Sequence, residues 1–295
     1  MSACELCPRK CGADREKGET GYCRMTDKVR AARAALHMWE EPCISGDEGS
    51  GTVFFSGCTL RCVFCQNSEI AAGNAGKEIT TDRLSEIFLE LQAKGANNIN
   101  LVTPTHYALQ IIKAVKRAKA DGLKLPIVYN TSGYETVETL KMLEETVNVY
   151  LPDMKYLSSE ASLKYSNAAD YFDRASEALR EMYSQTGKPV FDGRGIMTRG
   201  IIVRHLVLPG LTEDSKAVVK YLYETYGDDI YISIMNQYTP LVKSEKYPEL
   251  NRRVTKSEYD EVVDYALELG VVNGFIQEGD TASESFIPAF DCEGI

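Results

Sequence analysis

The chain has 295 residues, and because its 43 Asp and Glu outnumber its 33 Lys and Arg, its net charge is −10. This charge argues against general nucleic-acid binding. A composition of 44% hydrophobic and 26% charged residues excludes a wholly disordered chain. The sequence lacks the roughly 18 consecutive apolar residues of a membrane helix, and its first residues lack the apolar core of a secretory signal. We therefore expect a soluble, cytoplasmic protein.

Seven of the nine cysteines fall into two tight groups, which in a cytosolic protein are typical of metal sites. The first group lies in residues 1–27, a segment with almost no apolar residues, so this segment needs a metal or a crosslink to fold. Its spacing is C-x2-C-x3-C-x11-C, formed by Cys4, Cys7, Cys11 and Cys23. Four thiolates fit either a zinc ion that clips the structure or a second iron–sulfur cluster that relays electrons or recognises a partner. A disulfide pair fits badly with a reducing compartment.

After a connecting strand and loop at residues 28–47, short apolar runs alternate with amphipathic segments. Strands are expected at residues 53–55, 99–102, 127–129, 147–151, 201–207 and 230–235. Helices are expected at residues 80–95, 107–120, 136–144, 214–226 and 257–269. This alternation predicts a parallel sheet covered by helices, either open and doubly wound or closed into a partial barrel. A polar insertion at residues 158–187 is either a lid or docking surface or an ordinary surface helical hairpin.

The most specific motif is SGCTLRCVFCQN, in which Cys58, Cys62 and Cys65 follow the first predicted core strand. The carboxyl ends of parallel strands are where α/β folds bind ligands. A structural zinc or a saturated cubane takes four protein ligands, so three thiolates would leave one iron of a [4Fe–4S] cluster open. That iron could bind the amino and carboxylate groups of a small molecule and pass it one electron. The alternatives are a zinc site completed by a distant residue such as Cys43, or three thiols that bind nothing.

The pattern C-x3-C-x-aromatic-C, formed by Cys58, Cys62, Phe64 and Cys65, resembles the signature of the radical S-adenosylmethionine (SAM) superfamily. Within that superfamily the chain looks most like the pyruvate formate-lyase activating enzymes and their relatives. The resemblance implies that the cysteines bind the cluster and that SAM occupies the open iron. One electron would then split SAM into methionine and a 5′-deoxyadenosyl radical, which abstracts hydrogen from a substrate.

The resemblance covers residues 48–290 and implies the α/β fold of a partial (β/α)6 TIM-type barrel. The small cysteine-rich metal-binding segment at residues 1–27 would precede it, and a tail at residues 291–295 would follow.

The resemblance also assigns cofactor-binding residues to the ends of the next strands. The Gly-Gly-Glu motif that binds the methionyl amino group in the family is replaced by NLVTPTHY, so Thr103, Thr105 and His106 stand at its position. Backbone carbonyls and Thr hydroxyls can accept from an ammonium group. The alternative is a plain turn in which Thr105 caps a helix.

Two later strand ends resemble motifs of the activating enzymes. VYNTSGYE contributes Asn130 and Ser132, and Gly133 would keep side chains away from the cofactor. YLPDMKY contributes Lys155, which suits a carboxylate, and Asp153, which suits a cation or a ribose hydroxyl. A surface ion pair is the alternative for these two.

The last candidates lie on the fifth and sixth core strands. Arg204 matches a family arginine, and a charge in an apolar strand requires a ligand or an acidic partner. His205 points to the opposite face and is predicted to be structural. Gln237 and Tyr238 are weaker candidates, where relatives carry a His.

The resemblance implies a flavodoxin- or ferredoxin-type electron donor, and a glycyl-radical enzyme or another protein as substrate. Neither a membrane nor a nucleic acid is expected as a partner. Two other functions stay open on the sequence, namely a non-catalytic iron–sulfur carrier and a zinc module that recognises RNA or protein.

Overall fold

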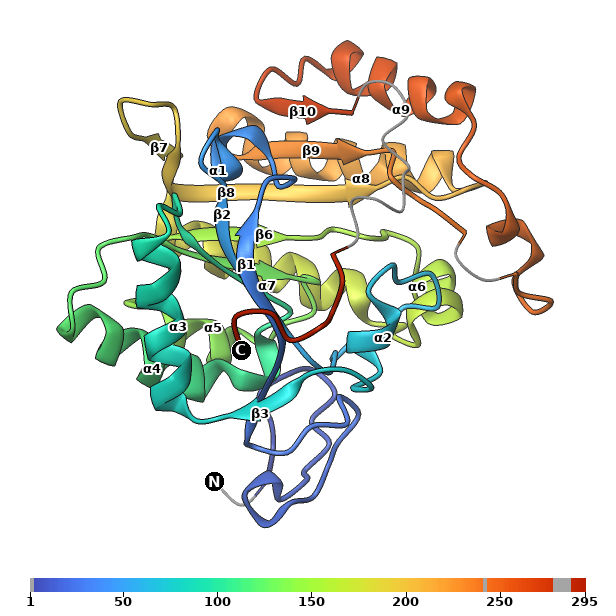
Figure 1. Cartoon of the computed structure of the whole chain (residues 1–295). Coiled ribbons are helices and arrows are strands. Elements are labelled where there is room, and N and C mark those ends of the chain that lie inside the picture. The colour runs from blue at the N-terminus through green and yellow to red at the C-terminus, as the bar shows by residue number, and fades with distance from the viewer. Residues whose placement is uncertain (1–2, 241–242, 278–287) are drawn as a thin grey trace.

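The computed structural model describes residues 3–240, 243–277 and 288–295. In this part of the chain the strands are β1 (Val29–His37), β2 (Ser50–Phe55), β3 (Lys77–Ile79), β4 (Ile99–Val102), β5 (Ile127–Thr131), β6 (Val149–Pro152), β7 (Val190–Phe191), β8 (Met197–Leu206), β9 (Tyr231–Met235) and β10 (Gly274–Ile276). The helices are α1 (Pro42–Ser45), α2 (Ser68–Ala71), α3 (Thr81–Ala93), α4 (Ala108–Ala120), α5 (Val137–Leu143), α6 (Ser159–Ser166), α7 (Tyr171–Thr186), α8 (Thr212–Tyr226) and α9 (Lys256–Leu269). Figure 1 shows the longer helices outside the sheet.

The strand order distinguishes between the two predicted architectures. The sheet runs β10-β9-β8-β6-β5-β4-β2-β1-β3. Neighbours from β2 to β10 are parallel, whereas β1 and β3 extend the β2 edge as antiparallel strands. A doubly wound sheet reverses its order at a switch point, and the described parallel strands follow the chain without reversal. The partial barrel is therefore confirmed.

All six predicted core strands are present, and their starts differ most at β2 and β8. β2 begins three residues earlier than predicted, and β8 begins four residues earlier because the polar stretch 197–200 pairs with β7. The pattern missed β3, β7 and β10, which are only two or three residues long and have no buried residue. Strands this short carry too few side chains to show an alternation.

The predicted helices form because each buries one apolar face. In α3 the Thr80 hydroxyl caps the helix by accepting a hydrogen bond from the backbone N–H of Arg83. The buried side chains of α3 are Leu84, Ile87, Phe88 and Leu91, and they share one apolar cluster with Val53 and Phe55 of β2. Burial of each such side chain contributes about 1.5–3 kcal/mol, so packing holds this helix against the sheet.

An apolar cluster closes the amino-terminal end of the barrel. Tyr129 and Tyr150 pack in the cluster that contains the outer helices α5 and α7. Their neighbours along β5 and β6 point to the other face of the sheet. There, Ile44 of α1 packs with Val128, Leu151 and Ile202. The polar side chains that line the cavity described below lie at the opposite end, where the strands finish.

The insertion at residues 158–187 forms a helical hairpin, but it is not simply a surface feature. α7 buries Ala175, Ala178, Leu179 and Met182 in the main core. α6 ends beside the cysteine loop, where Tyr165 O accepts a hydrogen bond from the backbone N–H of Val63 at 2.9 Å. The hairpin therefore forms part of the wall beside the cysteines.

The C-terminal residues lie beside β1, and the segment of residues 3–27 lies below the barrel in the view of Figure 1. The C-terminal residues run along β1, where Cys292 N donates to Ala32 O at 2.9 Å and Ala34 N donates to Glu293 O at 2.8 Å. Residues 3–27 contain a single 3-10 turn, Arg15–Lys17, as their regular structure. Among the described helices none has the length and hydropathy to cross a membrane.

Candidate functional site

A cavity opens at the carboxyl ends of the barrel strands, and most of the predicted site residues line it. Those residues are Cys58, Cys62, Phe64, Cys65, Thr103, Asn130, Ser132, Asp153, Lys155 and Arg204. They come from the loop after β2 and from the ends of β4, β5, β6 and β8. The weaker candidates Gln237 and Tyr238 also line the cavity, although the Tyr238 hydroxyl is bonded to Leu250 O at 2.6 Å.

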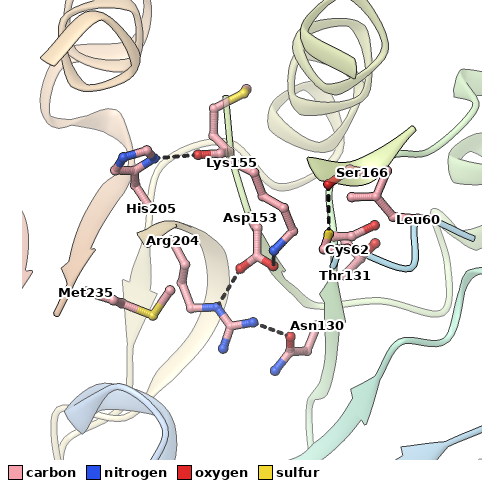
Figure 2. Close-up of polar contacts among 12 residues, drawn as sticks. Leu60, Cys62, Asn130, Thr131, Asp153, Lys155, Ser166, Arg204, His205 and Met235 are labelled. Atoms are coloured by element: carbon pink, nitrogen blue, oxygen red, sulfur yellow. Dashed lines mark hydrogen bonds and ion pairs between the residues drawn. The ribbon is translucent and has the colours of Figure 1, made fainter. Parts of the chain in front are cut away.

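Each of the three cavity thiols accepts a hydrogen bond. Cys58 Sγ accepts from the backbone N–H groups of Leu60 and Arg61, both at 3.3 Å. Cys62 Sγ accepts from Ser166 Oγ at 3.0 Å (Figure 2), and Cys65 has a hydrogen bond with the backbone of Asn67. Donors aimed at sulfur favour the thiolate form that binds metal.

Burial, by contrast, favours the neutral thiol over the thiolate. It raises the pKa of Cys62 to about 11 and that of Cys65 to about 12, and the charge of Lys155 acts in the opposite direction. A bound metal would displace these protons. Among the described residues no three His, Cys, Asp or Glu side chains are spaced for one metal ion. Three thiols that line one cavity fit an iron–sulfur cluster in which each thiolate would bind one iron and one iron would stay open.

Asp153 connects the two cations of the cavity. Lys155 Nζ donates to Asp153 Oδ2 at 2.7 Å, and Arg204 Nε donates to Oδ1 at 3.1 Å (Figure 2). Burial acts to raise the pKa of Asp153, but the charges of Lys155 and Arg204 hold it below its usual range. The side chains of Asp153 and Lys155 are only 14% and 15% exposed. The surface ion pair considered for these residues is therefore excluded.

A charge in an apolar strand requires an acidic partner, and Arg204 has two, Asp153 and Glu40. Besides Asp153, its Nη1 donates to Glu40 Oε2 at 3.2 Å, and its Nη2 donates to Asn130 Oδ1 at 2.6 Å. Burial acts to lower the pKa of Arg204, but Asp153 and Glu40 raise it above its ordinary value. As predicted, His205 points away from this network, and its Nδ1 is bonded to Met154 O at 2.7 Å.

Sequence reasoning missed Glu40 and its neighbour Glu41, which lie between β1 and α1. Glu41 is buried, and burial raises its pKa to about 7, with Arg204 acting to lower it. The only signal for either residue was the need of Arg204 for an acidic partner, which does not say where in the chain that partner lies.

The structure corrects the placement of Thr105 and His106, which do not line the cavity. The Thr105 hydroxyl donates to Glu135 Oε1 at 2.6 Å. His106 is buried, and its Nε2 bonds Ser56 O at 2.7 Å. Both residues belong to the short 3-10 turn Thr105–Tyr107, which points their side chains behind the sheet rather than toward its edge.

Thr103 does line the cavity, and its backbone has an uncommon conformation. Its φ is 59°, which is left-handed, and this conformation is costly for a β-branched residue, on the order of 1–3 kcal/mol. Such backbone strain concentrates at functional sites. Gly133, by contrast, has a different role from the one predicted. A Cβ there would lie 2.3 Å from Asp153 O, so the glycine makes room for β6 rather than for a cofactor.

The N-terminal cysteines lie beside the loop that carries the triplet. Cys7 and Cys23 are buried, and burial raises the pKa of both thiols, that of Cys7 to about 12. Each has a hydrogen bond with the backbone two residues later, at Arg9 and Met25. A Cβ on Gly57, the residue before Cys58, would lie 2.8 Å from Cys23 O.

A smaller cavity adjoins the first and shares residues with it. We call it the side chamber. It is lined by His37, Trp39, Glu40 and Phe54 together with Gln66, Asn67, Val102, Asn130, Arg204, Gln237 and Pro288. His37 packs edge-on against Phe54 with ring centroids 5.9 Å apart, and burial lowers its pKa to about 4. The chamber therefore presents amides and aromatic rings together with the charged side chains of Glu40 and Arg204.

The chain is similar to a known protein family and to an archaeal protein. The family model described as "Radical SAM superfamily" matches residues 52–222, which include the cysteine triplet and Arg204. The uncharacterized protein MJ0674 of Methanocaldococcus jannaschii is 29% identical over 273 residues, which are 89% of this chain and 74% of that protein.

Solved structures share the fold at low sequence identity. Streptococcus suis SuiB bound to the precursor peptide SuiA has a TM-score of 0.53 at 13% identity, covering 76% of this chain and 47% of SuiB. The chain thus spans about half the length of SuiB. Methylornithine synthase (PylB) has a TM-score of 0.50 at 16% identity, covering 81% of this chain and 68% of PylB.

Proposed function

Because the chain belongs to the radical SAM superfamily, we propose that it is an enzyme that cleaves SAM reductively at a [4Fe–4S] cluster held by Cys58, Cys62 and Cys65. The observation that carries this proposal is the meeting of three separated thiols and the polar ends of four strands in one cavity. When bound, the cluster supplies the electron that splits SAM into methionine and a 5′-deoxyadenosyl radical, which abstracts hydrogen from the substrate.

The chain's own polar groups would bind and orient SAM. Lys155 interacts electrostatically with Cys62 and Cys65, so its ammonium can hold a carboxylate beside the cluster. The strained backbone at Thr103 supports a carbonyl contact to the methionyl ammonium in place of the missing Glu. Asn130, Ser132 and Asp153 offer acceptors to ribose hydroxyls, and the partly buried Phe64 limits the access of water beside the triplet.

We propose a protein or peptide as substrate, with a glycyl-radical enzyme as the first candidate and a flavodoxin- or ferredoxin-type protein as electron donor. The motif resemblance to the activating enzymes supports the first, and the peptide-bound SuiB structure shows that this fold can accept a peptide in another protein. The side chamber, with its four carboxamide side chains, could bond to peptide groups.

We further propose that Cys4, Cys7, Cys11 and Cys23 bind a second metal centre, either zinc or an iron–sulfur cluster. The support is the burial of Cys7 and Cys23 in a segment with few apolar residues, and the backbone hydrogen bonds that both sulfurs make. Zinc would stabilise the segment, and a cluster next to Gly57 would pass electrons toward the triplet.

The function is tested by anaerobic reconstitution with iron and sulfide, followed by dithionite and SAM. We expect 5′-deoxyadenosine and methionine, and their absence would reject SAM cleavage. Cys62→Ala should lose the iron of the main site and the activity because it removes one of three ligands. Cys292→Ala, which changes a thiol in the C-terminal tail, is the control and should keep both.

Metal analysis of the Cys58→Ala/Cys62→Ala/Cys65→Ala triple variant isolates the N-terminal centre. Residual iron with sulfide would assign a cluster to Cys4, Cys7, Cys11 and Cys23, and one zinc per chain would assign a structural ion. A triple variant that binds neither metal would reject the second centre.

A further inference from the structure

Glu40 lies outside the part of the chain that matches the family, yet its side chain reaches into the cavity network. It precedes α1 by two residues, whereas the family match begins at residue 52. Its side chain is only 8% exposed. Burial of a carboxylate costs free energy unless the group is paired and hydrogen-bonded. The hydrogen-bond partners of Glu40 therefore indicate its role.

In the described part of the chain, the Glu40 carboxylate accepts its hydrogen bonds from barrel side chains. Oε2 accepts from Arg204 Nη1 at 3.2 Å. Oε1 accepts from Asn130 Nδ2 at 3.2 Å and from Asn100 Nδ2 at 3.0 Å. Asn130 also accepts from Arg204 Nη2 through its Oδ1. Glu40, Asn130 and Arg204 therefore form a closed ring of hydrogen bonds, in which each side chain restrains the other two.

This ring leaves part of Arg204 available for a ligand. A guanidinium has five N–H donors, and the bonds to Asp153, Glu40 and Asn130 use one on each nitrogen. Two donors remain. Because the three acceptors come from three different segments, they fix the plane of the guanidinium and hence the direction of the two free donors.

Glu40 also balances the charge of the cavity. Lys155 and Arg204 carry two positive charges, and Asp153 and Glu40 carry two negative ones. SAM itself has a net positive charge at neutral pH, because its sulfonium and ammonium groups outnumber its carboxylate. Loss of Glu40 would leave the four-residue network with a net charge of +1, which disfavours a cationic cofactor.

The segment between β1 and α1 holds Glu40 in position. The backbone N–H of Glu40 donates to Ser45 Oγ at 3.0 Å, and Ser45 Oγ donates to His37 O at 3.2 Å. Ile44, which is fully buried, anchors α1 in the closed end of the barrel. The carboxylate thus projects from a fixed turn rather than from a free loop.

We propose that Glu40 is a positioning residue for the SAM site, which orients Arg204 and Asn130 for the cofactor and offsets the charge of Arg204. This inference rests on the proposed function, since it concerns the same cavity. It adds that the segment before the family domain is required to complete the site.

The test compares SAM affinity in full-length Glu40→Gln, Glu40→Asp and Asp47→Asn, with Asp47 as an exposed carboxylate just after α1. Glutamine turns an N–H group toward Arg204 and removes the charge, so the SAM dissociation constant from equilibrium dialysis should rise about 10- to 100-fold. Glu40→Asp keeps the charge but shortens the reach and should give a smaller rise. Asp47→Asn should bind as the wild type does.

Two readouts separate positioning from a general loss of structure. Iron content should be unchanged in Glu40→Gln, while the change that SAM causes in the electron paramagnetic resonance spectrum of the reduced cluster should weaken. In an Arg204→Met background, Glu40→Gln should cause a much smaller further loss of affinity, because only its effect through Asn130 remains. An equal additional loss in that background, or wild-type affinity in Glu40→Gln alone, would overturn the proposal.

If Glu40→Gln fails to fold, Glu40→Asp decides, because wild-type affinity in that variant would show that its reach to Arg204 does not matter. A wild-type protein that neither binds nor cleaves SAM would instead reject the proposed function. The two failures are therefore distinguishable.

Discussion

The ammonium group of Lys155 lies between the cysteine triplet and the hydrogen-bond network of Asp153 and Arg204. Its ammonium bonds Asp153 at 2.7 Å, and the thiols of Cys62 and Cys65 act on its pKa. Burial acts to lower that pKa, but Asp153 and the two cysteines raise it above its ordinary value. Lys155 therefore stays charged throughout the range in which the protein is handled and can bind an anionic group of SAM.

Lys155→Ala should weaken SAM binding by one to two orders of magnitude, because a hydrogen bond to a charged group is worth about 1.5–3 kcal/mol. Isothermal titration under anaerobic conditions measures the dissociation constant. Lys94→Ala, at the exposed end of α3, serves as the control. An unchanged constant in Lys155→Ala would remove this residue from the site.

Glu135 is a second single residue with a predicted effect. This effect is on the stability of the fold rather than on SAM binding. Glu135 is buried, and its Oε1 accepts from the hydroxyls of Thr105 and Thr131, while Oε2 has no hydrogen-bond partner among the described residues. Burial raises its pKa from 4.5 to about 7. The folded protein thus holds this proton more tightly than the unfolded chain, so the stabilisation is complete below the unfolded pKa and is lost as the pH rises through 7.

Between pH 5 and pH 8, Glu135 alone should lower the free energy of unfolding by about 3 kcal/mol. Glu135→Gln keeps an oxygen for the two Thr hydroxyls and should remove this part of the pH dependence. Urea unfolding at the two pH values measures the effect, with the exposed Glu138→Gln as the control. The same pH dependence in wild type and Glu135→Gln would contradict the assignment.

At the scale of elements, the approach of β5 and β6 at their carboxyl ends sets the position of Asp153. The turn after β5 contains Gly133, which has a φ of 78° and lies against Asp153 O. The Tyr171 hydroxyl of α7 bonds both Ser132 O at 2.8 Å and Asp153 O at 2.9 Å. One turn and one helix therefore fix the carboxylate that Lys155 and Arg204 share.

Gly133→Ala should displace the end of β6, destabilise the protein and reduce SAM affinity together. Gly95→Ala is a matched control, since its φ is also positive at 87° but a Cβ there meets nothing within 4 Å. The control should show only the backbone cost, about 1 kcal/mol. Thermal unfolding and SAM titration of both variants make the comparison, and equal effects in the two would show that the contact with β6 is unimportant.

At the scale of the whole molecule, segments outside the family domain are built into its site. Glu40 completes the Arg204 network, and Pro288 lines the side chamber. At the N-terminus, Arg9 donates to Thr59 O at 2.9 Å and to Ser166 O at 3.0 Å, and it stacks on the Tyr22 ring at 4.0 Å. The cysteine-rich segment is thus attached to the triplet loop and to the residue that bonds Cys62.

Arg9→Ala should loosen the attachment of residues 3–27 to the barrel. We expect amide hydrogen exchange in this segment to speed up about tenfold or more, since several hydrogen bonds from a charged group are lost. Lys10→Ala, an exposed neighbour that makes none of these contacts, is the control. Unchanged exchange in Arg9→Ala would show that the segment is held by other contacts.

The sequence alone determined the barrel and the cysteine triplet, because both are written in local patterns. Short apolar runs alternate with amphipathic helices, and the three cysteines lie within eight residues of one another. Strand ends of a parallel sheet meet at one edge whatever the details of packing, so Asn130, Asp153, Lys155 and Arg204 could be predicted as neighbours.

Only the tertiary structure decided which residues near the strand ends face the cavity and which face away from it. Thr105 and His106 share the local signals of the true site residues, but a 3-10 turn directs them behind the sheet toward Glu135 and Ser56. Glu40 carries no local signal at all, since its partner Arg204 is 164 residues away. Contacts at such separation follow from how the whole chain packs, which no window of sequence contains.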